Sequence, residues 1–273
     1  MIIFVDMKKM IVSAALLLSL TTICFAQEIK CQWNGARVAF LGDSITDPSQ
    51  IKTTNDVYWH MFEDILGITP YVYGANGHRM NQIVGQAEKL EVQHGQDVDA
   101  IIVFIGTNDY NASIPMGEWF TYSEEITEED GHVQVARRHR ELVFDPDTFK
   151  GRTNIVLKWL KTHYSTKQII FFTPIHRGFA TFGDNNIQPD ENYANAHGLF
   201  INDYIQAVRE IADVWAVPVI DLAAVSGLYP MLEQYDQYFR NPPVDRLHPN
   251  TAGHKRMAYT LAYQLLGYPA KLD

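Results

Sequence analysis

Five continuous apolar runs recur along the chain, and the segments between them have the spacing of amphipathic helices. A strand that is apolar on both faces belongs to a parallel sheet covered by helices on both sides. The runs occupy residues 37–42, 71–76, 100–106, 168–174 and 217–222. Helical patterns occupy residues 56–66, 81–94, 149–164, 193–215 and 251–266. This alternation predicts an α/β fold, a three-layer α/β/α sandwich around a five-stranded parallel sheet.

Residues 27–273 contain no internal repeat, low-complexity tract or linker, which predicts a single domain. One insertion interrupts the alternation at residues 109–147, where aromatic side chains precede an acidic stretch at residues 124–130. Long connections in compact domains are usually functional or disordered. Two interpretations therefore stand: a solvated surface insertion, or a flap that faces a ligand at the carboxyl ends of the strands.

Residues 1–26 have the pattern of a secretory signal peptide, in which Lys8 and Lys9 precede an apolar run at about residues 11–20 and cleavage is expected after Ala26. The run is shorter than the roughly 20 residues that span a bilayer, so we expect no stable membrane anchor. Lipid attachment at Cys24 is disfavoured because the bulky Ile23 precedes it. The expected location is periplasmic or extracellular.

The formal net charge of −10 argues against a nucleic-acid partner. Of the two cysteines, only Cys31 follows the predicted signal peptide, which excludes an internal disulfide and a thiolate metal cluster. The histidines also lack the H-E-x-x-H spacing of a zinc site. We therefore expect neither a metal nor a cofactor.

Polar residues follow each of the first three strands: GDS at residues 42–44, NGH at 76–78 and GTND at 106–109. A parallel sheet collects such residues along one rim. Ser44 is a candidate nucleophile, although a serine after a strand more often caps a helix or a turn. The backbone N–H groups of Ser44 and Gly77 and the side-chain amide of Asn108 are candidate donors to an oxyanion.

The candidate base lies near the last helix, where Asp245 precedes His248 by three residues. This spacing lets the carboxylate accept a hydrogen bond from His248 Nδ1, which leaves Nε2 free to take the proton of Ser44. Taken alone, the pattern is more typical of a surface histidine before a helix. The three strand ends upstream favour the catalytic interpretation.

These four blocks, GDSIT, the glycine after the second strand, GTND and DRLHPN, resemble the SGNH or GDSL-type hydrolases. The resemblance implies a flavodoxin-like sheet and the activity of a serine esterase, lipase or carbohydrate deacetylase. It assigns the nucleophile to Ser44, the other triad members to Asp245 and His248, and oxyanion donors to Gly77 and Asn108. Gly74 competes with Gly77 for the glycine position, and we prefer Gly77 because the strand should already have ended there.

His176 and Arg177 follow the fourth strand in the sequence TPIHRG. They are either loop residues paired with nearby acids or residues that line the acyl-acceptor side of the pocket and contact a sugar.

The sequence as a whole predicts an exported serine esterase that forms an acyl-enzyme, with short acyl groups, for example O-acetyl groups of carbohydrate, as substrates. A small molecule or a glycan ester is the expected partner. A lysophospholipase or thioesterase is the nearest alternative, and a non-catalytic carbohydrate-binding protein on the same fold is a more distant one.

Overall fold

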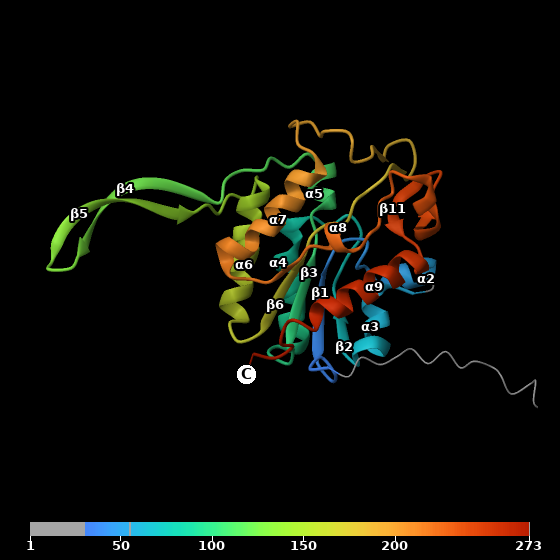
Figure 1. The fold of residues 1–273 in the computed structure, drawn as a ribbon, viewed down its shortest axis with the longest axis horizontal. Helices are drawn as coiled ribbons and strands as arrows, with labels where there is room; N and C mark the ends of the chain where they lie inside the picture. The colour runs from blue at the N-terminus through green and yellow to red at the C-terminus, as the bar shows by residue number, and fades with distance from the viewer. Residues whose placement is uncertain (1–30, 55, 273) are drawn as a thin grey trace, which may run out of the picture.

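A parallel sheet of five strands forms the centre of the protein (Figure 1). The computed structural model describes residues 31–54 and 56–272, so the predicted signal peptide lies outside the described residues. The strand order is β2-β1-β3-β6-β9, and every neighbouring pair is parallel. The strands are β1 (Arg37–Gly42), β2 (Thr69–Val72), β3 (Ala100–Phe104), β6 (Gln168–Phe172) and β9 (Val219–Ile220). The α/β fold with an all-parallel sheet is therefore confirmed.

Helices cover both faces of this sheet, as expected for strands that are apolar on both sides. One face packs against α3 (Tyr58–Leu66) and α9 (Thr251–Leu265). The other face packs against α4 (Ile83–His94), α6 (Phe149–His163) and α7 (Ile201–Trp215). Side chains alternate along each strand, so that successive residues of β1 enter opposite layers of the core.

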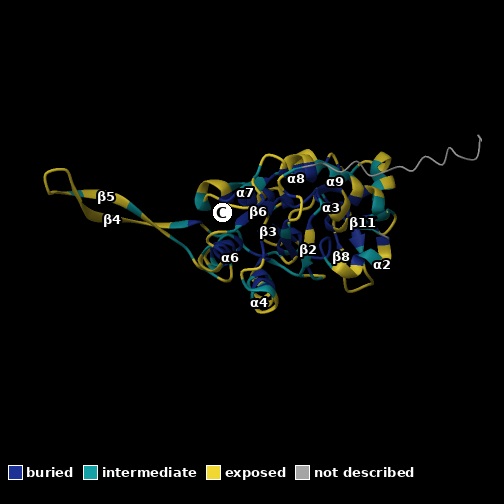
Figure 2. Ribbon diagram, turned by 90° about the horizontal axis from the view of Figure 1, so that it is seen from below, coloured by how far each residue is buried: buried dark blue, intermediate teal, exposed yellow. Residues whose placement is uncertain are grey.

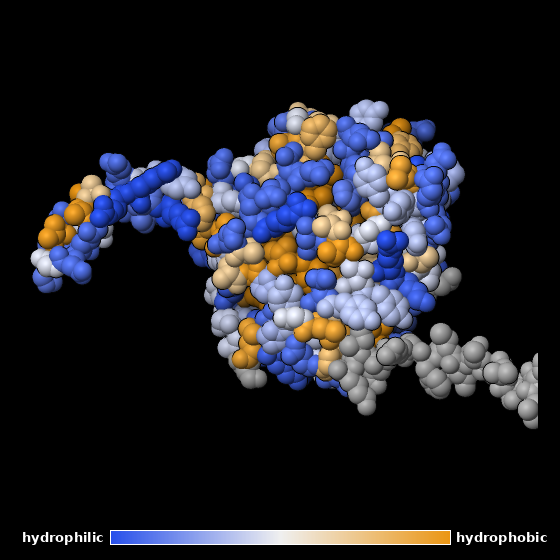
Figure 3. Space-filling view, in the orientation of Figure 1, coloured by the Kyte–Doolittle hydropathy of each residue, from blue (hydrophilic) through white to orange (hydrophobic). Residues whose placement is uncertain are grey.

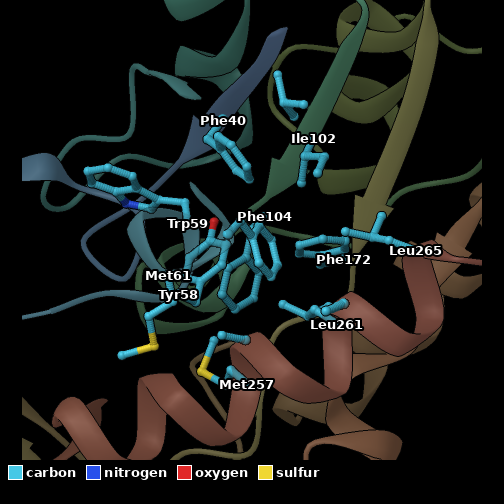
Figure 4. Close-up of a cluster of buried hydrophobic side chains, with 14 of the residues drawn as sticks. Phe40, Tyr58, Trp59, Met61, Ile102, Phe104, Phe172, Met257, Leu261 and Leu265 are labelled. Atoms are coloured by element: carbon cyan, nitrogen blue, oxygen red, sulfur yellow. The ribbon is translucent and has the colours of Figure 1, made fainter. Parts of the chain in front are cut away.

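Aromatic side chains fill the layer between the sheet and the helices α3 and α9 (Figure 4). The ring of Tyr58 on α3 makes edge contacts with Phe104 and Phe172, at centroid distances of 6.0 and 6.5 Å. Met257 and Leu261 of α9 belong to the same cluster. Each such buried side chain contributes about 1.5–3 kcal/mol relative to exposure, which fixes the sheet that carries the polar strand ends.

Several elements differ in extent from their predicted ranges, and for two of them the structure shows the physical reason. The second strand ends at Val72 and includes Pro70, which an edge strand tolerates because its missing N–H need not bond a neighbour. Helix α7 begins at Ile201 instead of residue 193, because the carboxamide oxygen of Asn195 accepts from two backbone N–H groups and holds a turn there.

A second, antiparallel sheet of four short strands lies beside the carboxyl end of β1, and the sequence analysis did not predict it. Its order is β10 (Phe239–Asn241), β11 (Asp245–Pro249), β7 (Ala180–Thr181) and β8 (Ile187–Gln188). The remaining short elements are α2 (Ile51–Thr54), α8 (Leu222–Val225), η1 (Pro48–Gln50), η2 (Met80–Gln82) and η3 (Glu233–Tyr238).

Helix α5 (Thr107–Asn111) leads into the insertion, which continues as a hairpin of β4 (Phe120–Glu129) and β5 (Val133–Leu142). The hairpin projects from the side of the body opposite β11 (Figure 1), and most of its residues are exposed (Figure 2). Its surface is largely hydrophilic, with hydrophobic side chains towards its tip (Figure 3). Across the part of the chain that the structure describes, no helix is both long and apolar enough to span a bilayer.

Candidate active site

The first three strand ends meet at the rim where the strand order reverses. Strand β1 lies between β2 and β3, so the chain enters the centre of the sheet and then builds outward on both sides. In such sheets the crevice outside the carboxyl ends of the strands, at this reversal, is where ligands bind. Ser44 follows β1, and Asn108 lies in the first turn of α5 directly after β3.

Ser44, His248 and Asp245 form a continuous chain of hydrogen bonds. Ser44 Oγ lies 2.8 Å from His248 Nε2, and His248 Nδ1 lies 3.1 and 3.0 Å from the two carboxylate oxygens of Asp245. A carboxylate only accepts, so Nδ1 carries the proton and Nε2 accepts from the Ser44 hydroxyl. All three residues are buried, with exposed fractions of 4%, 6% and 4% for Ser44, His248 and Asp245.

The carboxylate of Asp245 is held ionised by its surroundings. Burial opposes ionisation, but the hydrogen bond and charge of His248 and two backbone N–H groups together lower the pKa of Asp245. The N–H groups are those of Leu247 and His248, which donate to Oδ1 over 3.1 and 3.0 Å. Asp245 can therefore balance the positive charge that develops on His248 during proton transfer.

The turn that presents Ser44 depends on the lack of a side chain at Gly42. A Cβ at this position would lie 2.5 Å from the carbonyl oxygen of Phe104 on the adjacent strand. The side chain of Gln86 on α4 bonds both the N–H and the C=O of Gly42, each over 2.8 Å. The Asp43 carboxylate accepts from the N–H of Ile45 over 3.0 Å and so supports the turn. Burial raises the pKa of Asp43 to about 7.

Three candidate donors surround the space beside Ser44 Oγ. In the described chain, the backbone N–H groups of Ser44 and Gly77 donate to no protein acceptor. Asn108 Nδ2 donates one hydrogen to the carbonyl of His78 over 3.0 Å, which leaves its second hydrogen free. Asp47 fixes the adjacent loop, because its Oδ2 accepts from the N–H of Asn76 over 2.9 Å.

The structure distinguishes the two glycines after β2. Gly77 lines the cavity at Ser44, and its φ of +75° is a conformation that favours glycine. Gly74 is packed against Thr46, whose atoms would lie 2.6 Å from an added Cβ. The geometry therefore agrees with Gly77 as the donor and gives Gly74 a packing role.

Asp109, for which the sequence predicted no role, joins the loops after β2 and β3. It is fully buried, and it accepts from the N–H of Met80 over 2.9 Å and from Arg152 Nη1 over 3.3 Å. Burial raises the pKa of Asp109 to about 6, against the effects of the Met80 N–H and of Arg152. Asp109 thereby holds the loop that carries Gly77 against the turn that carries Asn108.

A cavity of about 320 Å³ opens beside the Ser44–His248 pair. Its walls come from the first three strand ends and from the small antiparallel sheet, and its lining residues are Ser44, Gln50, Asn76, Gly77, Asn108, Phe182, Asn186, Gln188, Arg240, Leu247 and His248. Apart from His248 on β11, the lining residues of the small sheet and its hairpin were not predicted from the sequence. The run Gly183-Asp184-Asn185-Asn186 between β7 and β8 has the composition of a hairpin turn and was the available signal.

The structure contradicts a substrate contact by Arg177. Its side chain is fully buried, and it donates to Thr107 Oγ1 over 3.1 Å and to Gln188 Oε1 over 2.7 Å. His176 also lies outside the cavity lining, and its Nδ1 is 2.9 Å from Glu191 Oε1. Arg177 instead positions two residues that line the cavity. It binds Gln188, and Gln188 in turn donates to Asn186 Oδ1 over 2.9 Å.

The β4–β5 hairpin contributes no residue to this cavity. The position of the hairpin therefore favours a surface insertion over a flap. Among residues 31–54 and 56–272, histidine, cysteine and acidic side chains form no group of three that could hold a metal ion.

Comparison with known proteins agrees with this architecture. The model of the GDSL-like lipase/acylhydrolase family matches residues 40–256, which include all four sequence blocks and the three residues of the hydrogen-bonded chain. A search of curated proteins found no match.

Two of the solved structures that match share the fold of almost the whole chain. A protein from Lactobacillus plantarum is 24% identical with a TM-score of 0.66, and the match covers 86% of this chain and 98% of that one. A possible lipase from Chitinophaga pinensis is 19% identical with a TM-score of 0.62, and the match covers 87% and 100% of the two chains. At these identities the likeness shows a common fold.

Proposed function

The chain belongs to the GDSL-like lipase/acylhydrolase family, and on this premise we propose that it is an exported serine esterase that hydrolyses short-chain carboxylic esters, including O-acetyl esters of carbohydrate. The observation that carries the proposal is the 2.8 Å contact between Ser44 Oγ and His248 Nε2, with Asp245 on the far side of the imidazole. A hydroxyl, a base and an orienting acid in this order are the requirements for an activated serine nucleophile.

In the proposed mechanism, Ser44 Oγ attacks the ester carbonyl while His248 Nε2 takes the hydroxyl proton. The negative charge on the carbonyl oxygen is stabilised by the N–H groups of Ser44 and Gly77 and by the amide of Asn108. Collapse of the tetrahedral intermediate expels the alcohol, which receives its proton from His248. Water then attacks the acyl-Ser44 ester with His248 as base, which releases the acid and restores Ser44.

The preference for a short, polar ester rests on the cavity. At about 320 Å³ it is close to the lower end of the range of ligand pockets, roughly 300–1,000 Å³. Five of its lining side chains are carboxamides, from Gln50, Asn76, Asn108, Asn186 and Gln188. Such a lining matches hydroxyl and amide groups of a sugar better than a long acyl chain.

Turnover of p-nitrophenyl acetate, butyrate and octanoate by the protein and its Ser44→Ala variant tests this function. We expect the highest kcat/KM for acetate, and a loss of about a million-fold in kcat when Ser44 is replaced, as for removal of other serine nucleophiles. A variant that hydrolyses all three esters as fast as the wild type contradicts the mechanism. A preference for octanoate favours the lysophospholipase or thioesterase alternative.

Export rests on residues 1–26 alone, and N-terminal sequencing of the protein recovered from outside the cytoplasm tests it. The expected first residue is Gln27. A chain that retains its first 26 residues in all fractions contradicts export.

A further inference from the structure

Arg240 lies in the wall of the cavity that contains Ser44. It belongs to β10, which pairs with the strand that carries Asp245 and His248. Of the side chains that line the cavity, it is the one that carries a full charge at neutral pH, since the lining includes no aspartate, glutamate or lysine. A strongly acidic protein therefore presents a cation beside its candidate nucleophile.

The guanidinium of Arg240 has hydrogen-bonding capacity that the described chain does not use. Nη2 donates to Gln50 Oε1, and Nε is buried without an acceptor. Within the described ranges Arg240 forms no ion pair, in contrast to Arg246 on the neighbouring strand, which lies 2.9 Å from Asp236. An arginine has five donor hydrogens, so Nη1 and the second hydrogen of Nη2 remain available at the end of the side chain.

The surroundings of Arg240 favour an anion as the missing partner. Burial lowers the pKa of Arg240, which means that the cation is incompletely solvated. The carboxylate of Asp245 attracts it, but that carboxylate already accepts from His248 and from two backbone N–H groups. A guanidinium with free terminal nitrogens binds a carboxylate through two parallel hydrogen bonds, and each such charged bond is strong when water is excluded.

We propose that Arg240 is a specificity-determining residue that binds a carboxylate of the substrate, so that the preferred ester is an O-acylated acidic sugar such as a uronic acid. The inference rests on the proposed esterase function and names the substrate class of the same site. Gln50 holds the guanidinium in place by accepting from Nη2, while the free nitrogens face the substrate's acid group. The neutral carboxamides of the lining are left to contact its hydroxyl groups.

Acetate release from O-acetylated glucuronic acid and from O-acetylated glucose tests the proposal, because the two substrates differ mainly in the carboxylate. We expect the wild type to show a kcat/KM about 10- to 100-fold higher for the glucuronic acid ester, the range expected for a hydrogen bond to a charged group. In Arg240→Gln the ratio of the two values should fall close to one. Arg240→Lys keeps the charge but loses the planar guanidinium that can bind a carboxylate through two hydrogen bonds, so it should retain part of the preference.

Arg246→Gln is the matched control, because it removes the same charge from the same small sheet at a residue that does not line the cavity. It should keep the full preference. A measurement on the wild type alone gives a second test: free glucuronate should inhibit hydrolysis of p-nitrophenyl acetate at lower concentration than glucose does.

Three results overturn the proposal while leaving the esterase function intact. They are equal wild-type kcat/KM for the two sugar esters, an unchanged preference in Arg240→Gln, and cleavage of p-nitrophenyl acetate with no cleavage of either sugar ester. Failure of the esterase function itself is distinct, because it would appear as p-nitrophenyl acetate turnover that does not depend on Ser44.

Discussion

The two oxygens of Asp245 have different tasks. Oδ1 accepts from the backbone N–H groups of Leu247 and His248 and also lies 3.1 Å from His248 Nδ1, whereas Oδ2 contacts Nδ1 alone among the described residues, over 3.0 Å. The oxygen of an asparagine at this position could still accept from the two backbone N–H groups. Its NH₂ group would then take the place of Oδ2 and face Nδ1. Because an NH₂ group donates, it would favour the imidazole tautomer with the proton on Nε2, which cannot accept from Ser44.

We therefore expect Asp245→Asn to fold normally and to lose about 1,000- to 10,000-fold in kcat, as found for the equivalent change in a serine protease triad. Steady-state hydrolysis of p-nitrophenyl acetate gives the rate, and a thermal melt confirms the fold. A loss below tenfold with an intact fold would show that Asp245 does not select the tautomer.

Single residues also show where sequence reasoning succeeds and where it fails. Ser44 and Asn108 could be placed because strand ends and turn chemistry are local patterns, and the parallel sheet brings them to one rim. The buried position of Arg177 could not be predicted, because a charged residue after a strand is usually exposed and its partner Thr107 is distant in sequence. Arg240 was missed for a related reason, since only the fold brings β10 beside Ser44.

At the scale of elements, the buried strands of the central sheet were predictable and the short strands of the second sheet were not. Strands β7 and β8 have two residues each, which is too short for any period-two alternation to be recognised. Nevertheless, the sheet they form with β10 and β11 supplies one wall of the cavity. The local pattern therefore identifies the chemistry of the site, while much of its specificity depends on pairings that become visible only in three dimensions.

The β4–β5 hairpin is stabilised largely from within. Acidic residues of β4 pair with basic residues of β5, for example Glu124 opposite Arg138, and Arg138 lies 4.0 Å from the ring centroid of Tyr122. Exposed contacts of this kind contribute about 0–1 kcal/mol each. The base of the hairpin is fixed to the body by Asn154, whose Nδ2 donates to the carbonyls of Trp119 and Val143 over 3.1 and 2.7 Å.

Replacing residues 121–141 by a Gly-Ser-Gly link should leave kcat/KM for p-nitrophenyl acetate within about twofold of the wild type, because distant sites act independently. Phe120 and Leu142 are paired across the two strands, so a short link can join them without moving the base. The melting temperature serves as control, with an expected change of no more than about 2–4 °C. A large loss of activity at unchanged melting temperature would restore the flap interpretation.

For the molecule as a whole, the buried ionisable groups near the site make the free energy of unfolding depend on pH. Burial raises the pKa of Asp43 to about 7, far above the value of about 3.9 expected in the unfolded chain. The folded state therefore binds the Asp43 proton more tightly. The resulting stabilisation is present below pH 4 and is lost as the pH rises towards 7.

His254 makes the free energy of unfolding change with pH in the opposite direction. It is buried against Tyr58, with the rings stacked at a centroid distance of 6.2 Å, and burial lowers the pKa of His254 to about 3. Its unfolded form takes up a proton near pH 6.5, so its contribution is lost as the pH falls below that value. The free energy of unfolding of the wild type therefore depends on pH through opposing effects. The contribution of Asp43 is isolated only by comparing the wild type with a variant that lacks this carboxylate.

Asp43→Asn supplies that difference, because asparagine keeps an oxygen for the Ile45 N–H but does not ionise. The unfolding free energy of the variant minus that of the wild type should increase between pH 4 and pH 7 by a few kcal/mol, on the order of 2–4. The effects of His254 and Asp109 are present in both proteins and largely cancel. Urea unfolding at pH 4.5 and pH 7.5 measures the difference at both ends of this window. A difference that is the same at both pH values would mean that Asp43 ionises as easily in the folded chain as in the unfolded one, and the turn that presents Ser44 would then tolerate a full charge.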